Sequence, residues 1–208
     1  MCIRDSLLRG SLPRRALPAG GLIPPGLGGH RTRPFGSQGP AAGTAPPALE
    51  LTAAVMPHPN GVYLRTARAL FDPLVDRGVR VEIQPQDEAG FEATLERGDT
   101  DLVLGCWDAE YPDADSLTFG LFDSREGLLR RYHGGPELDR LIHAARTERN
   151  AAVRHAHYVR IEESLEREAA LLALFHEQTA VFARPEVEGL LIELFHPTVP
   201  YEELRVRA

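Results

Sequence analysis

Hydrophobic residues between positions 49 and 104 recur with two spacings, the alternation typical of strands and the wider spacing typical of helices. Strands are predicted where apolar runs or alternations occur: 49–55, 79–83 and 102–104. Helices are expected between them, over about 62–78 and 87–97, and Pro73 inside the first predicts a kink or an early end. Alternating strands and helices of this kind predict an α/β fold with a parallel sheet and right-handed crossovers.

The second half of the chain is predicted to be mainly helical. Helices with one apolar face are expected from Pro136 onward and over about residues 150–168. Short strands are predicted after them, the first two separated by a polar turn at 177–178: 171–176, 179–183 and 190–192.

The N-terminal stretch differs from both halves. Residues 7–48 are rich in Gly, Pro and Arg, which favours an extended loop that buries little and wraps over something larger. Residues 1–6 fit nothing downstream, and we interpret them as an artefactual start outside the fold. The N-terminal region contains no apolar segment of the length that the core of a secretory signal needs.

Composition narrows the class of protein. The formal charge is −7, which argues against a nucleic-acid partner because phosphate binding needs clustered Lys and Arg. No apolar run approaches the length that crosses a bilayer, so no membrane span is expected. The two cysteines, Cys2 and Cys106, are too few for a disulfide framework or a zinc site, and Cys106 is interpreted as a small buried hydrophobe.

The segment of residues 105–115 carries the most informative chemistry. It directly follows the predicted strand at 102–104, and ligands of open α/β sheets bind at the carboxyl ends of strands. Trp107 and Tyr111 supply aromatic surface with polar tips. Carboxylates that could accept hydrogen bonds from a cation stand beside them: Asp108, Glu110 and Asp113. This combination suits a ligand with an ammonium group and an apolar body; a surface loop with one packed aromatic residue and solvated acids is the alternative.

Other chemistries find little support in the sequence. A calcium loop of the EF-hand type needs glycine at its sharp turn, whereas Pro112 falls inside the acidic segment. His155 and His157 are two residues apart on a predicted helix and point to different faces, so they do not share a metal. The sequence has no motif for phosphate binding, dinucleotide binding, zinc proteolysis or a nucleophile elbow. We therefore predict no metal, no cofactor and no catalytic residue, and hence no enzyme.

The acidic segment also resembles part of a known family. Residues 107–113 read W-D-A-E-Y-P-D, which is similar to the W-x-A-D-Y-P-D segment of family 5 extracellular solute-binding proteins, the peptide and nickel receptors. Further segments resemble motifs of that family in the same order, over about residues 20–208: Gly21–Gly26, Gly98–Leu102, Leu121–Ser124, Pro136–Ile142, Arg154–Glu163, Leu174–His176 and Val187–Leu190. Each motif alone is weak, and their order carries the resemblance.

The resemblance implies an α/β fold of the periplasmic-binding-protein-like type II, in which two lobes close on a ligand. Residues 49–177 would form the ligand-binding second lobe, preceded by residues 7–48 as a loop segment of an incomplete lobe. Residues 178–208 would be a returning C-terminal segment whose strands complete the other lobe. The resemblance thus implies that the N-terminal part of the family's fold lies outside this sequence.

The same resemblance implies a substrate-binding component of an ABC importer, with permease subunits as partners and a periplasmic or extracellular, membrane-attached location. In oligopeptide-binding members an aspartate of this segment pairs with the α-amino group of the peptide. Glu110 is the matching position here, and it keeps the charge while adding a methylene. A peptide or a similar small amine-bearing solute is therefore the expected ligand. The alternative is a ligand sensor of the same fold within a larger regulatory or signalling protein.

Overall fold

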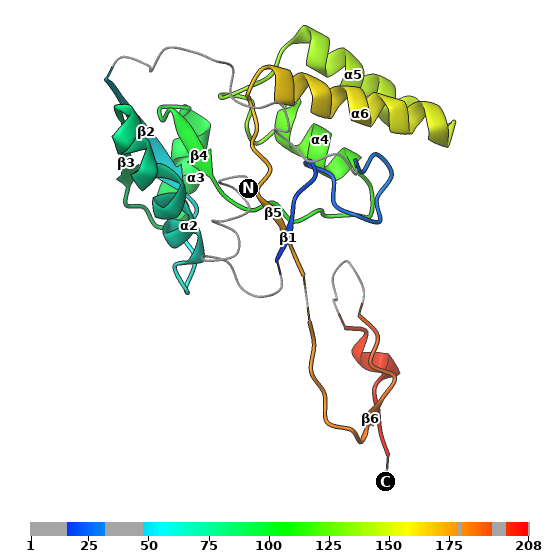
Figure 1. The fold of residues 1–208 in the computed structure, drawn as a ribbon. Helices are drawn as coiled ribbons and strands as arrows, with labels where there is room; N and C mark the ends of the chain where they lie inside the picture. Colours follow the sequence, from blue (N-terminus) through cyan, green and yellow to red (C-terminus); the bar gives the residue numbers. More distant parts are fainter. Residues whose placement is uncertain (1–15, 32–47, 179, 193–198, 208) are drawn as a thin grey trace.

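The computed structural model describes residues 16–31, 48–178, 180–192 and 199–207. Its first part is a three-stranded sheet made of β2 (Leu49–Val55), β3 (Val79–Gln84) and β4 (Leu102–Leu104). The strand order is β3-β2-β4, and both neighbours run parallel to β2 (Figure 1). The parallel sheet expected from the alternating pattern is therefore confirmed.

Two helices cover opposite faces of this sheet. Adjacent residues of a strand point to opposite faces. Accordingly, Val55 packs with side chains of α2 (Val62–Phe71), whereas Ala54 packs with side chains of α3 (Glu88–Arg97). Burial on both faces explains why the end of β2 reads as an apolar run rather than as an alternation.

Local signals end these helices where the sequence predicts. α2 stops at Phe71 and is followed by the 3-10 turn η1 (Asp72–Arg77), which has Pro73 near its start, so the expected early end is confirmed. The side chain of Asp87 accepts the N–H of Gly90 and caps α3. Gly98 closes the same helix in the left-handed conformation, with φ 67°.

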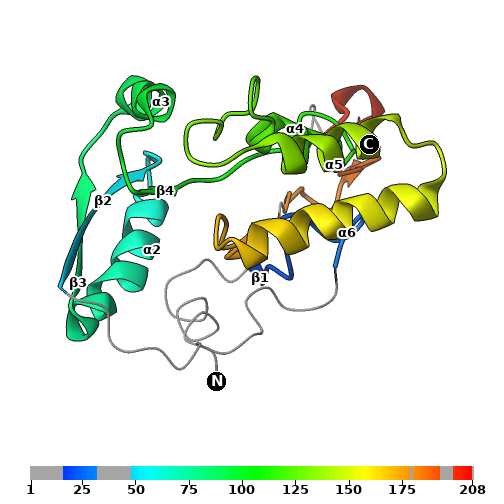
Figure 2. The same ribbon diagram turned by 90° about the horizontal axis from the view of Figure 1, so that it is seen from above.

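The second part of the molecule is a group of helices: α4 (Asp115–Phe122), α5 (Pro136–Thr147) and α6 (Ala151–Arg167). α5 and α6 pack along each other and confirm the two helices predicted in this half (Figure 2). α4 was not predicted, because most of its residues are buried and no amphipathic period marks it in the sequence. Among the described ranges, no helix combines the length and apolar character needed to cross a membrane.

The segment before β2 is buried more deeply than the sequence predicts. Ile23 is 0% exposed and belongs to the core of the helical part, and Ala19 is also buried. β1 (Ala16–Pro18) pairs antiparallel with β5 (Phe175–Glu177). The expectation that residues 7–48 bury little is wrong for the described residues 16–31, because they pack onto helices far along the chain. The proposed artefactual start at 1–6 lies outside the described residues.

A buried carboxylate holds this segment, which we call the 19–31 strap. Oε1 of Glu162, on α6, accepts the backbone N–H of Ile23 at 2.9 Å. Arg31 pairs with the same carboxylate, with 3.8 Å from its Nε to Oε2. Gly21 passes so close to Glu162 that a Cβ atom there would collide with the carboxylate. Burial raises the pKa of Glu162, and the bonds from the strap oppose that rise.

The C-terminal part differs from the prediction. The described residues 180–183 and 190–192 form no strand, Thr179 lies outside the described residues, and the strand expected over 171–176 is reduced to β5. A strand needs a backbone partner, which apolar sequence alone does not provide. Instead β6 (Val187–Glu188) pairs antiparallel with β7 (Arg205–Val206), beside η2 (Tyr201–Glu203), and this segment extends away from the helices (Figure 1). Many of its apolar side chains are exposed: Phe182, Leu191, Ile192, Tyr201 and Val206.

Candidate functional site

The acidic, aromatic segment connects the two parts of the fold. Residues 105–114 leave the carboxyl end of β4 and lead into α4 (Figures 1 and 2). The N–H of Met56, just after β2, donates to the carbonyl oxygen of Leu104 at 2.8 Å, so the two strands end side by side. Beyond that edge, Trp107 packs against the core of the helical part.

One residue of α4 holds both Trp107 and Glu110. The carbonyl oxygen of Ser116 accepts the indole Nε1–H of Trp107 at 3.2 Å, and its Oγ accepts the backbone N–H of Glu110 at 2.9 Å. The indole also lies against Gly120, where an added Cβ would come within 3.3 Å of Cζ2. The Trp107 ring and the main chain of Glu110 are thus fixed relative to α4.

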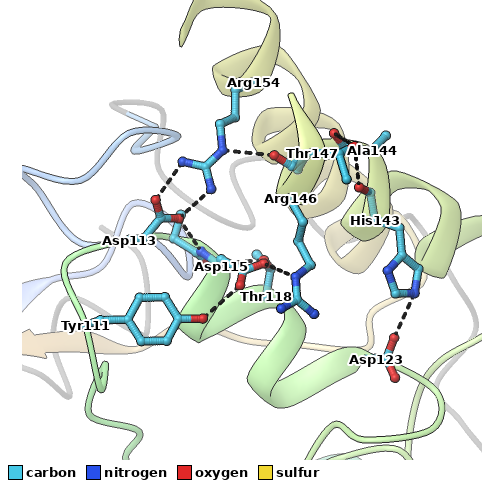
Figure 3. A network of polar contacts seen from close by, with 12 residues as sticks. Tyr111, Asp113, Asp115, Thr118, Asp123, His143, Ala144, Arg146, Thr147 and Arg154 are labelled. Carbon is cyan, nitrogen blue, oxygen red and sulfur yellow. Dashed lines mark hydrogen bonds and ion pairs between the residues drawn. The ribbon is translucent and has the colours of Figure 1, made fainter. Parts of the chain in front are cut away.

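The phenol of Tyr111 is tied to the first turn of α4. Its hydroxyl donates to Oδ2 of Asp115 at 2.7 Å (Figure 3). Burial, and then this hydrogen bond, raise the pKa of Tyr111 to about 12, so the hydroxyl keeps its proton at neutral pH. Nε of Arg146, on α5, lies 3.3 Å from Oδ1 of Asp115 and balances its charge. The Tyr111 side chain is 40% exposed and leaves aromatic surface available.

Asp113 is engaged in an internal ion pair. Arg154 donates from Nη1 and Nη2 to its two carboxylate oxygens at 2.6 and 2.8 Å (Figure 3). The Tyr158 hydroxyl donates to Oδ1 at 3.1 Å. Burial pushes the pKa of Asp113 upward, but the bonds from Arg154 outweigh it and hold the pKa below its usual value. This carboxylate therefore has little capacity left to bind the cation of a ligand.

The other two predicted acids are open to solvent. Asp108 and Glu110 are exposed. Within the described part of the chain, neither carboxylate has a hydrogen bond or an ion pair with another residue. The structure thus divides the acids of the segment into Asp113, which is paired internally, and Asp108 and Glu110, which have no charged partner among the described residues.

Sequence reasoning missed the residues that hold the segment in place: Ser116, Arg146, Arg154 and Tyr158. Arg154 and Tyr158 do fall in one of the motifs that carry the family resemblance. Neither spacing nor composition links Arg154 to an acid 41 residues earlier, and Ser116 has no local pattern around it. Contacts between distant helices and a loop leave no periodic signal in sequence.

Cys106 lies beside this segment and is partly rather than fully buried. The neighbouring Tyr63 hydroxyl donates to Oε1 of Glu177 at 3.3 Å. Burial raises the pKa of the Cys106 thiol. The thiol is therefore protonated at neutral pH and packs as a small apolar side chain. Across the described ranges, no three His, Cys, Asp or Glu residues are grouped so that they could hold a metal ion.

Comparison with known proteins finds the same arrangement of sheet, helical part and connecting segment in solved structures of binding proteins. No family model matches the sequence. A curated protein of Haemophilus influenzae, described only as a binding protein, is 26% identical over 111 residues, which are 53% of this chain and 21% of that protein. The chain therefore spans about a fifth of the length of this curated relative.

Solved structures match the chain over nearly its whole length. HbpA2 from Haemophilus parasuis superposes with a TM-score of 0.79 at 15% identity, covering 99% of this chain and 43% of that one. The clavulanic acid biosynthesis oligopeptide binding protein 2 gives a TM-score of 0.81 at 20% identity, covering 99% and 41%. The periplasmic binding protein DppA from Helicobacter pylori, in complex with the peptide STSA, gives 0.71 at 14% identity, covering 100% and 42%. The α/β, periplasmic-binding-protein-like fold inferred from the motifs is confirmed, and the chain spans about two fifths of these structures.

Proposed function

We propose that this chain is the ligand-binding portion of an ABC-importer binding protein that takes up a peptide or a similar small amine-bearing solute. The observation that carries the proposal is the segment after β4, where the exposed carboxylates of Asp108 and Glu110 have no partner in the described ranges and lie near the exposed ring of Tyr111. The ammonium group of the ligand pairs with Glu110, assisted by Asp108, and its apolar body packs on Trp107 and Tyr111. The likeness to binding proteins, including one complexed with a peptide, supports this assignment.

The same proposal assigns a role to each part of the chain. Residues 49–177 form the lobe that presents the acidic segment, and the 19–31 strap belongs with this lobe because Ile23 lies in its core. Residues 178–208 form the returning segment, whose exposed apolar side chains pack against the other lobe of the complete binding protein. Ligand binding closes the two lobes, and the closed form is presented to permease subunits at the outer face of the membrane.

The peptide STSA provides a direct test, because its only cation is the α-amino group. Calorimetry should detect binding of STSA and much weaker binding of N-acetyl-STSA. Glu110→Gln should weaken STSA binding about ten- to a hundredfold, since it removes a charge-assisted hydrogen bond, while Glu110→Asp should retain much of the affinity. Glu126→Gln, an exposed acid on the connection between α4 and α5, is the control for net charge. Equal binding of STSA by the parent and Glu110→Gln would refute the proposal.

A further inference from the structure

The hydrogen-bond acceptor that fixes the Glu110 main chain comes from α4. Ser116 Oγ lies 2.9 Å from the Glu110 nitrogen, while the carbonyl oxygen of the same residue accepts the Trp107 indole N–H at 3.2 Å. Ser116 is only 4% exposed, so it has almost no surface to offer a ligand. A single buried residue thus contacts both the acidic and the aromatic component of the proposed site.

The first turn of α4 is itself held from the opposite side. Asp115 pairs with Arg146 of α5, and Asp113 pairs with Arg154 of α6. The backbone N–H of Asp115 also donates to Oδ1 of Asp113 at 2.8 Å. Ser116 directly follows Asp115 and lies three residues after Asp113, so its position is set by the helical core rather than by the loop. It can therefore transmit the rigidity of α5 and α6 to residues 107–110.

We propose that Ser116 is a positioning residue, which holds the backbone of Glu110 so that its carboxylate meets the ammonium group of the ligand. The inference rests on the proposed function. Without Oγ, the Glu110 N–H loses its acceptor in the described structure, and the exposed segment gains freedom that ligand binding must then remove. In Ser116→Ala the carbonyl oxygen remains, so Trp107 keeps its partner. The loss therefore falls on the amine contact and spares the apolar contacts.

Four variants of the chain test this by calorimetry with STSA and N-acetyl-STSA: Ser116→Ala, Glu110→Gln, the two combined, and Ser164→Ala. Ser164 is a matched control, because it is also a helical serine with 4% exposure, and its hydroxyl donates to Glu168 away from the site. Ser116→Ala should weaken STSA binding about three- to tenfold and leave N-acetyl-STSA binding unchanged. On the Glu110→Gln background it should cause no further loss, and Ser164→Ala should behave like the parent chain.

Emission of Trp107, the single tryptophan, reports independently on the loop and should be the same in Ser116→Ala and the parent. Ser116→Cys keeps the shape of the side chain with a weaker acceptor, so it should lose less affinity for STSA than Ser116→Ala. This variant tests the inference if Ser116→Ala destabilises the fold. A parent chain that does not distinguish the two peptides overturns the proposed function and this inference together. If the parent distinguishes the two peptides, either of two results overturns the inference alone. Ser116→Ala could weaken the binding of both peptides equally, or it could cause its full loss of STSA affinity on the Glu110→Gln background as well.

Discussion

The ion pair between Asp113 and Arg154 links the candidate segment, residues 105–114, to α6, and a double-mutant cycle can measure its strength. The perturbations are Asp113→Asn, which keeps the shape of the side chain, and Arg154→Met, which keeps most of the apolar stem. Arg154 also donates to the carbonyl oxygen of Ala145 at 2.9 Å and to the Tyr158 hydroxyl at 2.7 Å. Its loss therefore affects α5 and α6 as well as the loop.

The magnitude follows from geometry and exposure. Charge-assisted hydrogen bonds contribute about 1.5–3 kcal/mol each when shielded, and exposed ion pairs contribute below about 1 kcal/mol. The two side chains are 27% and 31% exposed, which places the pair between these limits. We expect a coupling free energy of about 1–2 kcal/mol. Arg154→Met should lose about 3 kcal/mol, because it also removes the donor to Tyr158 and Ala145 and leaves the Asp113 carboxylate without its cation.

Urea unfolding at about pH 7 gives the coupling free energy. It is measured on the parent, both single variants and the double variant by far-UV circular dichroism and Trp107 emission. The lowered pKa of Asp113 fixes the sign of the pH dependence. The carboxylate contributes stability that is fully present above the pKa of the unfolded chain and is lost as the pH falls through the lower, folded pKa. The coupling should therefore shrink as the pH falls below about 4, the unfolded pKa of aspartate. Additive single-variant effects at neutral pH, or a coupling that grows on acidification, would refute this reasoning.

Two further predictions concern the 19–31 strap. Gly29 and Gly26 have nearly the same backbone angle φ, 100° and 98°. A Cβ added at Gly29 would lie 2.6 Å from Cβ of Tyr158, whereas a Cβ added at Gly26 would have no atom of the described residues within 4 Å. In urea unfolding, Gly29→Ala should therefore lower the free energy of unfolding by about 2–4 kcal/mol, and Gly26→Ala by about 1–2 kcal/mol. Equal losses would show that packing of the strap against α6 is unimportant. Burial raises the pKa of Glu162, so the stability linked to its proton is present below the unfolded pKa and is lost as the pH rises through the folded pKa. Glu162→Gln, which keeps an acceptor for Ile23, should flatten the fall in the urea midpoint as the pH rises above the unfolded pKa of glutamate, about 4.3. An unchanged slope would contradict the assigned burial.

The sequence by itself determined the parallel α/β unit. The spacing of apolar residues specifies its strands and helices. Single residues mark where the helices begin and end: Pro73 after α2, Asp87 before α3 and Gly98 after α3. These signals act within a few residues, so they can be read without knowing what packs against them. The order of short motifs added the fold class, and the position of residues 105–114 after a buried strand placed the candidate segment at the end of β4.

The tertiary structure alone decided which acids of that segment are available. Asp113 and Glu110 look alike in the sequence, but Arg154 neutralises the first from 41 residues away and leaves the second exposed. The same holds for the 19–31 strap, where a Gly-rich stretch becomes core because Glu162, 139 residues later, accepts the N–H of Ile23. Burial and charge compensation depend on partners that are distant along the chain, so the local pattern of residues does not specify them.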